Sequence, residues 1–599
     1  MVILLCSWTT KHINLYKLGS VLSDIQLSIA IVMEALFVQV LAAISTFLVI
    51  AVTMRLRAPG RIKYPPGPPA WPLIGSMFNN PATYPLAYKN WRAVYGPISY
   101  FRLLTQDVIV LNTREAANEL LEKQSASYSD RPRQVMCGEL MSWNRGIALC
   151  PAGARHRAYR KLVNSVLSAD ATKRAWSSHE RAACAFVADL LLFSSYAASE
   201  STHPEASSES VKGRTSSGSE FISRLRHSIG THAVEIIYGS EYTAEDGIEI
   251  EGGRGHLGMS ARDAEDYIQN ADEQHTLFTA AVLPFAYIVD WIPWLRYIPE
   301  ATPFVHFKKI ARQARRNLEA LTWEPYLKAR ERIKCGCLQN SLVDVCFKSN
   351  PDPSPQEEEC TAWAAMGAYT AGSDTTIAAL TTVFLAASLN PEAQALAQLE
   401  LDTIVGRERM PRLDDRPALP YVTAFVRECM RSVPSVPLGV PHRALNDDVL
   451  YGYFIPKGAT VIANIRGMLH DPEVYSSPFT FNPARFLPRA GISTLPGIEG
   501  RAEPDLGSLP YGFGRRICPG MHMADSEVWI YTAMFLWAFN IKKSGADVST
   551  GANHTVTQQP ENWQSIKLSE GGIQCPIPFG VELAVRSEEL KAVIQAEAV

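Results

Sequence analysis

The sequence predicts a mainly α-helical domain with a small β region, preceded by an N-terminal transmembrane helix. Three observations support this fold class. The segment Ala35–Met54 near the start of the chain carries no charge, and the apolar run Cys360–Leu389 contains no proline. Most of the remaining chain consists of helical runs separated by proline and glycine, with short strand-like segments near residues 97–112 and a strand-like tail at residues 574–585.

The segment Ala35–Met54 is predicted to be a membrane anchor. Spanning the hydrocarbon core of a bilayer takes roughly 20 apolar residues, so the segment is long enough. The basic residues that follow it directly are Arg55, Arg57, Arg61 and Lys63. By the positive-inside rule, the chain after the anchor faces the cytosol. The alternative is a cleaved signal peptide, which the long apolar run and the basic residues after it disfavour.

The anchor divides the chain into segments of different character. Residues 1–34 form an N-terminal extension, and Met33 offers a conventional start that would make the stretch before it a gene-model extension. Residues 55–75 are a basic and proline-rich linker, whose prolines exclude a helix. Residues 76–599 form the globular body. Within it, residues 196–220 are rich in Ser and Glu and are predicted to be a disordered insertion.

The composition does not indicate nucleic acid as a partner, and none is expected. The 599-residue chain is 47% hydrophobic, has a formal net charge of −3 and shows no basic face or charge run. Its eleven cysteines are scattered, which fits a reducing compartment better than a disulfide framework. Only Cys335 and Cys337 lie close together, so the cysteine spacing does not indicate a structural zinc site.

The long apolar run contains a polar stretch, Ala371–Thr376, "AGSDTT". The run is apolar nearly all round and is therefore predicted to be a buried helix. Glycine costs a helix about 1 kcal/mol relative to alanine, and Ser and Thr hydroxyls compete for backbone carbonyls and bend helices. The stretch therefore predicts a locally distorted helix at a functional site. The alternative is a kinked core helix with a solvated Asp374.

The stretch Pro510–Gly520, "PYGFGRRICPG", carries the main chemical signal. Its single cysteine, Cys518, stands before Pro519 and a long helix-forming run, and proline is favoured at the first helical position. The positive end of that helix is expected to lower the pKa of the thiol. Three glycines allow a sharp turn or a close approach to a flat group, and two arginines add positive charge. Such a loop suits a metal macrocycle with acidic side groups.

This loop resembles the haem loop of the cytochrome P450 family, F-x-x-G-x-R-x-C-x-G. Gly514, Arg516, Cys518 and Gly520 match the pattern, and Tyr511 stands at its aromatic position. The resemblance implies haem b (iron protoporphyrin IX) as cofactor, with Cys518 as the axial ligand of the iron and with Tyr511 and Gly514 in the cofactor-binding loop. It also implies the triangular, mostly helical prism of that family.

Three further motifs match the family in the expected order. Glu428 and Arg431 in "ECMR" resemble its E-x-x-R pair, and Arg485 in "FNPARF" resembles the third member of a structural triad. Residues three apart on a helix share a face, although E-x-x-R alone is more often a surface ion pair. "AGSDTT" resembles the oxygen-activation motif. By this resemblance Thr375 stabilises bound dioxygen and Asp374 relays protons, and both are the predicted catalytic residues.

The propionates of a haem need cations. The resemblance points to Arg516 in the haem loop, His442 in "PHRA", Arg160 in "GARHRAYRKL" and Arg131 in "YSDRP". Arg160 belongs to the family motif W-x-x-x-R, and this chain has His156 at the tryptophan position.

The function that the resemblance implies is that of a microsomal monooxygenase of the fungal secondary-metabolism type. Electrons are expected from NADPH through NADPH-cytochrome P450 reductase, with cytochrome b5 as a further partner, and O2 is the co-substrate. The expected location is the endoplasmic reticulum membrane, single-pass, with the catalytic domain in the cytosol. The candidate substrate-pocket residues are Ala368, Tyr369, Leu438, Gly439 and Val440. An apolar pocket with one phenol favours a lipophilic terpenoid or polyketide-like substrate.

Two alternatives stay open from the sequence. One is a haem-thiolate isomerase, dehydratase or peroxide-using enzyme of the same fold; such enzymes often lack the Asp-Thr pair that this chain has. The other is a non-enzymatic haem-binding membrane protein, which would not need proton-relay residues.

Overall fold

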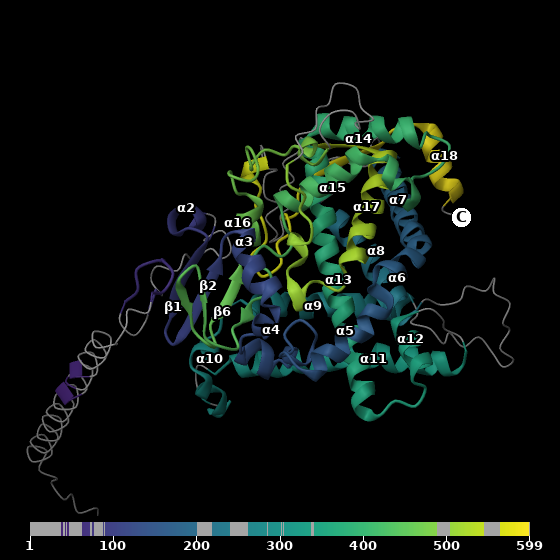
Figure 1. The fold of residues 1–599 in the computed structure, drawn as a ribbon. Helices are drawn as coiled ribbons and strands as arrows, with labels where there is room; N and C mark the ends of the chain where they lie inside the picture. The colour runs from purple at the N-terminus through teal and green to yellow at the C-terminus, as the bar shows by residue number, and fades with distance from the viewer. Residues whose placement is uncertain are drawn as a thin grey trace, which may run out of the picture.

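In the computed structural model (Figure 1), the described residues are 63–71, 75–76, 88, 90–199, 218–239, 261–283, 286–300, 302, 305–336, 341–487, 503–543 and 563–597, with isolated positions between 38 and 46.

Most of the body is helical, as predicted, and several helices pack around one long helix, α13, which runs through the middle of the body (Figure 1). The helices are α2 (Trp91–Tyr95), α3 (Arg114–Ala117), α4 (Ser125–Tyr128), α5 (Ala154–Leu167), α6 (Ala169–Arg174), α7 (Trp176–Ser199), α8 (Gly218–Tyr238), α9 (Ala261–Ala281), α10 (Ile288–Trp291), α11 (Phe307–Lys334), α12 (Leu342–Ser349), α13 (Pro355–Leu389), α14 (Pro391–Ile404), α15 (Pro420–Ser432), α16 (Ile465–Leu469), α17 (Met521–Ala538) and α18 (Glu588–Glu597).

In the described part of the chain the β region is small and divided among three sheets. The largest has the order β1-β2-β6-β3, in which β2 and β6 are parallel and the other two pairs are antiparallel. Two antiparallel pairs, β4–β5 and β7–β8, complete it, so the strands predicted near residues 97–112 and in the C-terminal tail are present. The strands are β1 (Ile98–Leu103), β2 (Gln106–Leu111), β3 (His442–Arg443), β4 (Asp448–Leu450), β5 (Tyr453–Ile455), β6 (Thr460–Ala463), β7 (Phe539–Lys543) and β8 (Val581–Val585).

Helix α13 is the predicted long buried helix, and it begins five residues earlier than the sequence indicated. Ser354 and Glu357 form a capping box, in which each side chain accepts the backbone N–H of the other. Pro355 occupies the first turn, where a missing N–H costs nothing. Among the described helices α13 is the one long and apolar enough to cross a bilayer, but 72% of its most apolar 18 residues are buried inside the protein. It is therefore a core helix.

The predicted distortion at Ala371–Thr376 does not interrupt α13, which is helical without a break from Pro355 to Leu389. The hydroxyls of Thr370, Ser373 and Thr375 donate to the carbonyls four residues earlier, at 3.0, 3.0 and 2.8 Å. These hydroxyls share carbonyls with the helical ladder instead of replacing it.

The predictions for the N-terminal segments fall largely outside the described residues. Within the predicted anchor, positions 38, 39, 42, 45 and 46 are described and are helical. The structure does not describe the rest of the anchor, residues 1–34 or most of the linker. Residues 63–71 of the linker contain no helix. Helix α7 continues to Ser199 and α8 begins at Gly218, so both enter the predicted insertion at 196–220, and residues 200–217 between them lie outside the described part.

Candidate active site

A cavity of about 360 Å³ lies beside α13 in the middle of the body, and most predicted site residues line it. Its wall is formed by α13, the segment after α15, the start of β3, the loop before α17 and parts of α5, α8 and α9. The predicted residues on this wall are Cys518, Arg516, His442, Arg160, Arg131, Tyr511, Thr375, Ala368, Leu438, Gly439 and Val440. The predicted residues that do not line it are Asp374, Tyr369, Gly514, Glu428, Arg431 and Arg485.

The loop that carries Cys518 is closed by its own backbone. The N–H of Cys518 donates to the carbonyl of Tyr511 at 2.9 Å, and α17 begins at Met521 with Gly520 as its N-cap. The sequence predicts Pro519 at the first position of this helix. Instead, Pro519 and Gly520 form a turn, and the helix begins two residues after Pro519. The consequence is a sulfur held at the cavity wall by a short, closed loop.

Burial decides the acidity of the Cys518 thiol. Burial raises its pKa above the ordinary value, and the N–H of Gly520 and the charge of Arg160 oppose this without overcoming it. The expectation that the helix terminus lowers the pKa is thus wrong for the free thiol. A sulfur in such a place becomes a thiolate when it binds a metal ion, because a coordinating thiol loses its proton.

Three arginines at the cavity wall make no ion pair with a described carboxylate, although the charge of Asp130 acts on two of them, Arg131 and Arg516. Arg131, Arg160 and Arg516 donate to backbone carbonyls, at distances between 2.5 and 3.3 Å, and none makes an ion pair with a described residue. Burial lowers the pKa of Arg516 to about 10, and burial together with the charge of Arg516 lowers the pKa of Arg131. Burying a cation that is not fully paired with an anion lowers the stability of the fold. An acidic ligand at this wall would supply the missing negative charge.

Two neutral histidines stand beside these arginines. Nδ1 of His442 donates to the carbonyl of Tyr128 at 2.6 Å, and burial and Arg131 lower the pKa of His442 to about 3. His156, at the position of the family's tryptophan, also lines the cavity, and burial and Arg516 lower its pKa to about 3. Both rings therefore add hydrogen-bonding nitrogens without adding charge.

The residues present fit haem b. One wall supplies a sulfur ligand, the arginine cluster supplies cations for two propionates, and the remaining wall is mostly aliphatic. On α13, Ala368, Ala371 and Thr375 line the cavity. Gly372 also lines it, and a Cβ added there would meet nothing within 4 Å. No neighbouring residue thus requires this glycine, and its small size widens the cavity.

Asp374 and Tyr369 lie on another face of α13, which corrects the placement of Tyr369 in the substrate pocket and leaves the proton-relay role of Asp374 a prediction. The carboxylate of Asp374 lies 3.0 Å from Nη1 of Arg226 and 2.5 Å from Nδ1 of His275. Burial alone would raise the pKa of Asp374, but His275 and Arg226 outweigh it and lower the pKa. Asp374 is ion-paired rather than solvated. Tyr369 packs its ring 4.7 Å from that of Tyr267, so the phenol predicted for the substrate pocket is absent from this wall.

His275 is a cavity residue that the sequence did not indicate. It lies on α9, lines the cavity and joins it to Asp374. Its Nε2 is buried and has no hydrogen-bond partner among the described residues. No motif surrounds it, and it is brought here by the packing of α9 against α8 and α11, both of which contact α13. The C-terminal segment Gly571–Ile573 reaches the same wall and was also missed.

The predicted triad is present and fully buried. Arg431 donates to both oxygens of Glu428, at 2.7 and 2.9 Å, and Nε of Arg485 donates to Oε1 of Glu428 at 3.2 Å. Arg485 also pairs with Glu503 at 3.0 Å, a fourth member that the sequence did not indicate. The triad ties α15 to the short turn Pro483–Phe486, away from the cavity wall.

Gly514 is required by packing within the chain. Its φ is +55°, and an added Cβ would lie 2.1 Å from the carbonyl oxygen of Leu121. The prediction of a direct cofactor contact is not supported by the cavity wall, which does not include Gly514.

Comparison with known proteins agrees with this arrangement. The chain matches the family model described as Cytochrome P450 over residues 65–190 and 256–565. It is 33% identical over 557 residues to Cytochrome P450 monooxygenase 208 of Postia placenta, covering 93% of this chain and 96% of the relative. It is 31% identical over 537 residues to Cytochrome P450 monooxygenase claR of Ampulloclitocybe clavipes, covering 89% of each, and 32% identical over 515 residues to Cytochrome P450 monooxygenase COX2 of Coprinopsis cinerea, covering 84% of this chain and 88% of the relative.

Proposed function

The chain belongs to the cytochrome P450 family of haem-thiolate monooxygenases, and from that premise we propose that it is a membrane-anchored enzyme that oxidises a lipophilic secondary metabolite. The observation that carries the proposal is the cavity itself. It combines Cys518, three arginines that make no ion pair with a described residue, and a mostly aliphatic wall beside Thr375.

The arginine cluster and Cys518 have separate tasks in binding the cofactor. Arg131, Arg160 and Arg516 would hold the propionates of haem b, and Cys518 would be the ligand of its iron. When bound, the haem supplies the iron-centred activation of O2, which a thiolate ligand favours. The aliphatic side chains around it exclude water and accept the hydrocarbon part of a substrate.

Proton supply rests on residues that reach the cavity from two directions. The hydroxyl of Thr375 lies at the cavity wall and donates to the carbonyl of Ala371 at 2.8 Å, so its oxygen remains able to accept a proton-carrying partner. Asp374 does not reach the cavity, but His275 does. We propose that the carboxylate of Asp374 holds the His275 ring in place through its contact with Nδ1, and that Nε2 of His275 passes protons to the cavity.

Substrate class and partners follow from the walls and the N-terminal segment. Ala368, Leu438 and Val440 make the substrate side apolar, which supports a terpenoid or polyketide-like substrate. The uncharged segment Ala35–Met54 and the basic residues after it support an anchor in the endoplasmic reticulum with a cytosolic catalytic domain. NADPH-cytochrome P450 reductase would then be the electron donor on the same membrane face, with cytochrome b5 as a second donor.

The test is turnover in microsomes that contain the enzyme and a reductase. Candidate terpenoids and polyketides are incubated with NADPH under air, and products are identified by mass spectrometry. The proposal predicts a product one oxygen atom heavier, labelled from ¹⁸O2 and dependent on NADPH. An isomerase or dehydratase would convert substrate without NADPH, a peroxide-using enzyme would need only hydrogen peroxide, and a haem-binding scaffold would give no product.

A further inference from the structure

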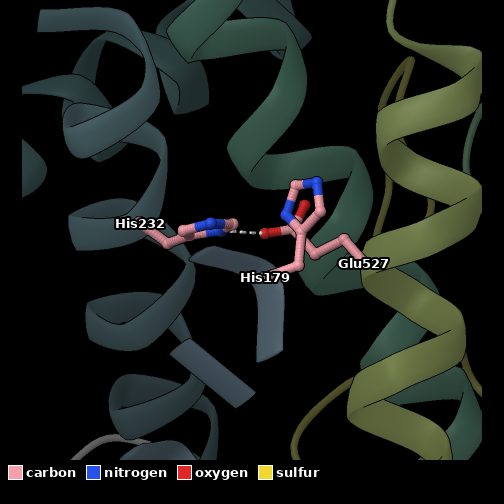
Figure 2. A group of neighbouring side chains, drawn as sticks. All are labelled: His179, His232 and Glu527. Atoms are coloured by element: carbon pink, nitrogen blue, oxygen red, sulfur yellow. Dashed lines mark hydrogen bonds and ion pairs between the residues drawn. The ribbon is translucent and has the colours of Figure 1, made fainter. Parts of the chain in front are cut away.

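A second cluster of metal-ligand residues lies behind the cavity wall, where three helices meet. His179 comes from α7, His232 from α8 and Glu527 from α17, and all three are buried. Figure 2 shows the side chains converging between α8 and α17, with a dashed line from His232 to Glu527. One donor atom from each residue lies within 4.8 Å of the other two.

The hydrogen bonds of this cluster are incomplete. Nδ1 of His232 bonds to Oε1 of Glu527 at 2.7 Å. Nε2 of His232 and both ring nitrogens of His179 have no partner among the described residues. Each buried polar atom left without a partner costs about 1–3 kcal/mol, and such atoms are rare in native proteins. The contact between His232 and Glu527 therefore leaves the other three ring nitrogens without a hydrogen-bond partner among the described residues.

The cluster is held in place by its surroundings. The hydroxyl of Ser178, next to His179, donates to Glu235 at 3.0 Å, which ties α7 to α8 one turn from His232. The two imidazoles stand nearly perpendicular, at 79°, with their centroids 4.9 Å apart. Both ring nitrogens of His179 lack a hydrogen-bond partner among the described residues, so one of them can offer a lone pair. Neutral imidazole is the form that binds metals.

We propose that His179, His232 and Glu527 bind a zinc ion, separate from the haem iron. Two imidazoles and one carboxylate form a ligand set that zinc commonly takes, with a fourth position left for water. Donors about 2.0–2.1 Å from zinc lie about 3.4 Å apart in a tetrahedron. The three donors lie within 4.8 Å of one another and would move to that spacing when the ion binds.

The main cavity gives the ion and its water a route to the site. Glu527 belongs to the cluster and also lines the cavity. Ala233, adjacent to His232, lines the cavity as well. The bound ion would satisfy nitrogens that otherwise lack partners, and it would link α7, α8 and α17. Because α17 begins two residues after Pro519, the ion would brace the helix that follows the Cys518 loop.

The first experiment is a metal count on the full-length, haem-loaded protein, purified without a histidine tag. Inductively coupled plasma mass spectrometry measures zinc, iron and the other first-row metals together. We expect one zinc per haem iron in the wild type and its loss in His179→Gln and Glu527→Gln. The matched control is His227→Gln, because His227 lies on the same helix, α8, but is exposed and pairs with Glu265. It should keep its zinc.

The second experiment needs no variant, so it holds even if a buried substitution prevents folding. Zinc K-edge X-ray absorption on the wild type should show nitrogen and oxygen neighbours at about 2.0–2.1 Å, whereas binding to Cys335 and Cys337 would show sulfur at about 2.3 Å. Sulfur neighbours, zinc well below one per haem, another metal in its place, or unchanged zinc in His179→Gln would each overturn the proposal. These readouts do not depend on turnover, so they stand apart from the proposed oxidation.

Discussion

Replacing Glu428 by alanine should destabilise the fold more than any other single loss of a charge described above. Glu428 accepts two hydrogen bonds from Arg431, one from Arg485 and one from the N–H of Asn482, at 2.7, 2.9, 3.2 and 2.9 Å. The side chains of Glu428, Arg431 and Arg485 are at most 1% exposed. After the substitution Arg431 keeps the carbonyl of Leu469 but has no acidic partner among the described residues, whereas Arg485 keeps Glu503.

The magnitude follows from which cation loses its only anion. Removing one partner of a buried ion pair costs about 3–5 kcal/mol, and a folded domain has about 5–15 kcal/mol of stability in total. Glu503→Gln is the matched comparison, because Arg485 still pairs with Glu428 and the side chain of Glu503 is 11% exposed. Its expected cost is about 1 kcal/mol, the worth of a partly exposed pair.

The assay is the urea midpoint at which haem absorbance is lost, together with the ratio of haem to protein after purification. Glu428→Ala should give little haem-loaded protein and a much lower midpoint, and Glu503→Gln should stay near the wild type. The triad does not line the cavity, so this loss would act through the fold. Full haem content and an unchanged midpoint in Glu428→Ala, or a larger effect of Glu503→Gln, would refute the reasoning.

Four further predictions concern the cavity and the topology. Cys518→Ser should lose the thiolate-specific Soret band of the reduced carbon-monoxide complex, and a variant that kept the band would not have lost the iron ligand. Thr375→Ala should fold and bind haem but give less product per NADPH and more hydrogen peroxide; wild-type coupling would remove this threonine from oxygen activation. Asp374→Asn and His275→Gln should each slow turnover, and the double variant should be no slower than the worse single one, because residues on one path are not additive; additive losses would mean separate roles. Asn553, in the sequon "NHT", should carry no glycan in a eukaryotic host, since it would face the cytosol, and a glycan found by peptide mapping would contradict the topology.

The features that could be predicted from the sequence are those encoded over short distances. The Cys518 loop, the i, i+3 spacing of Glu428 and Arg431, and the strands near residues 97–112 depend on neighbouring residues and on one backbone period, so their residue types identify them. The end of α13 at Asn390-Pro391 is of the same kind. Its start was missed because proline is allowed in the first turn, and the capping box of Ser354 and Glu357 lies outside the apolar run.

The orientation of side chains around α13 was decided by tertiary structure alone. In a helix that is apolar nearly all round, the pattern of apolar residues does not indicate which face lines the cavity. The sequence therefore could not show that Thr375 faces the cavity while Tyr369 and Asp374 do not. The acidity of Cys518 was likewise set by burial, which outweighs the local helix terminus.

Groups assembled from distant parts of the chain were also decided by the fold. His275 reaches Asp374 and the cavity only because α9 packs near α13, and His232 meets Glu527 across 295 positions of sequence. The sequence determined which side chains were available for chemistry. Packing determined which of them are close together and removed from water, because burial and distance set the strength of charge and metal interactions, and neither is encoded locally.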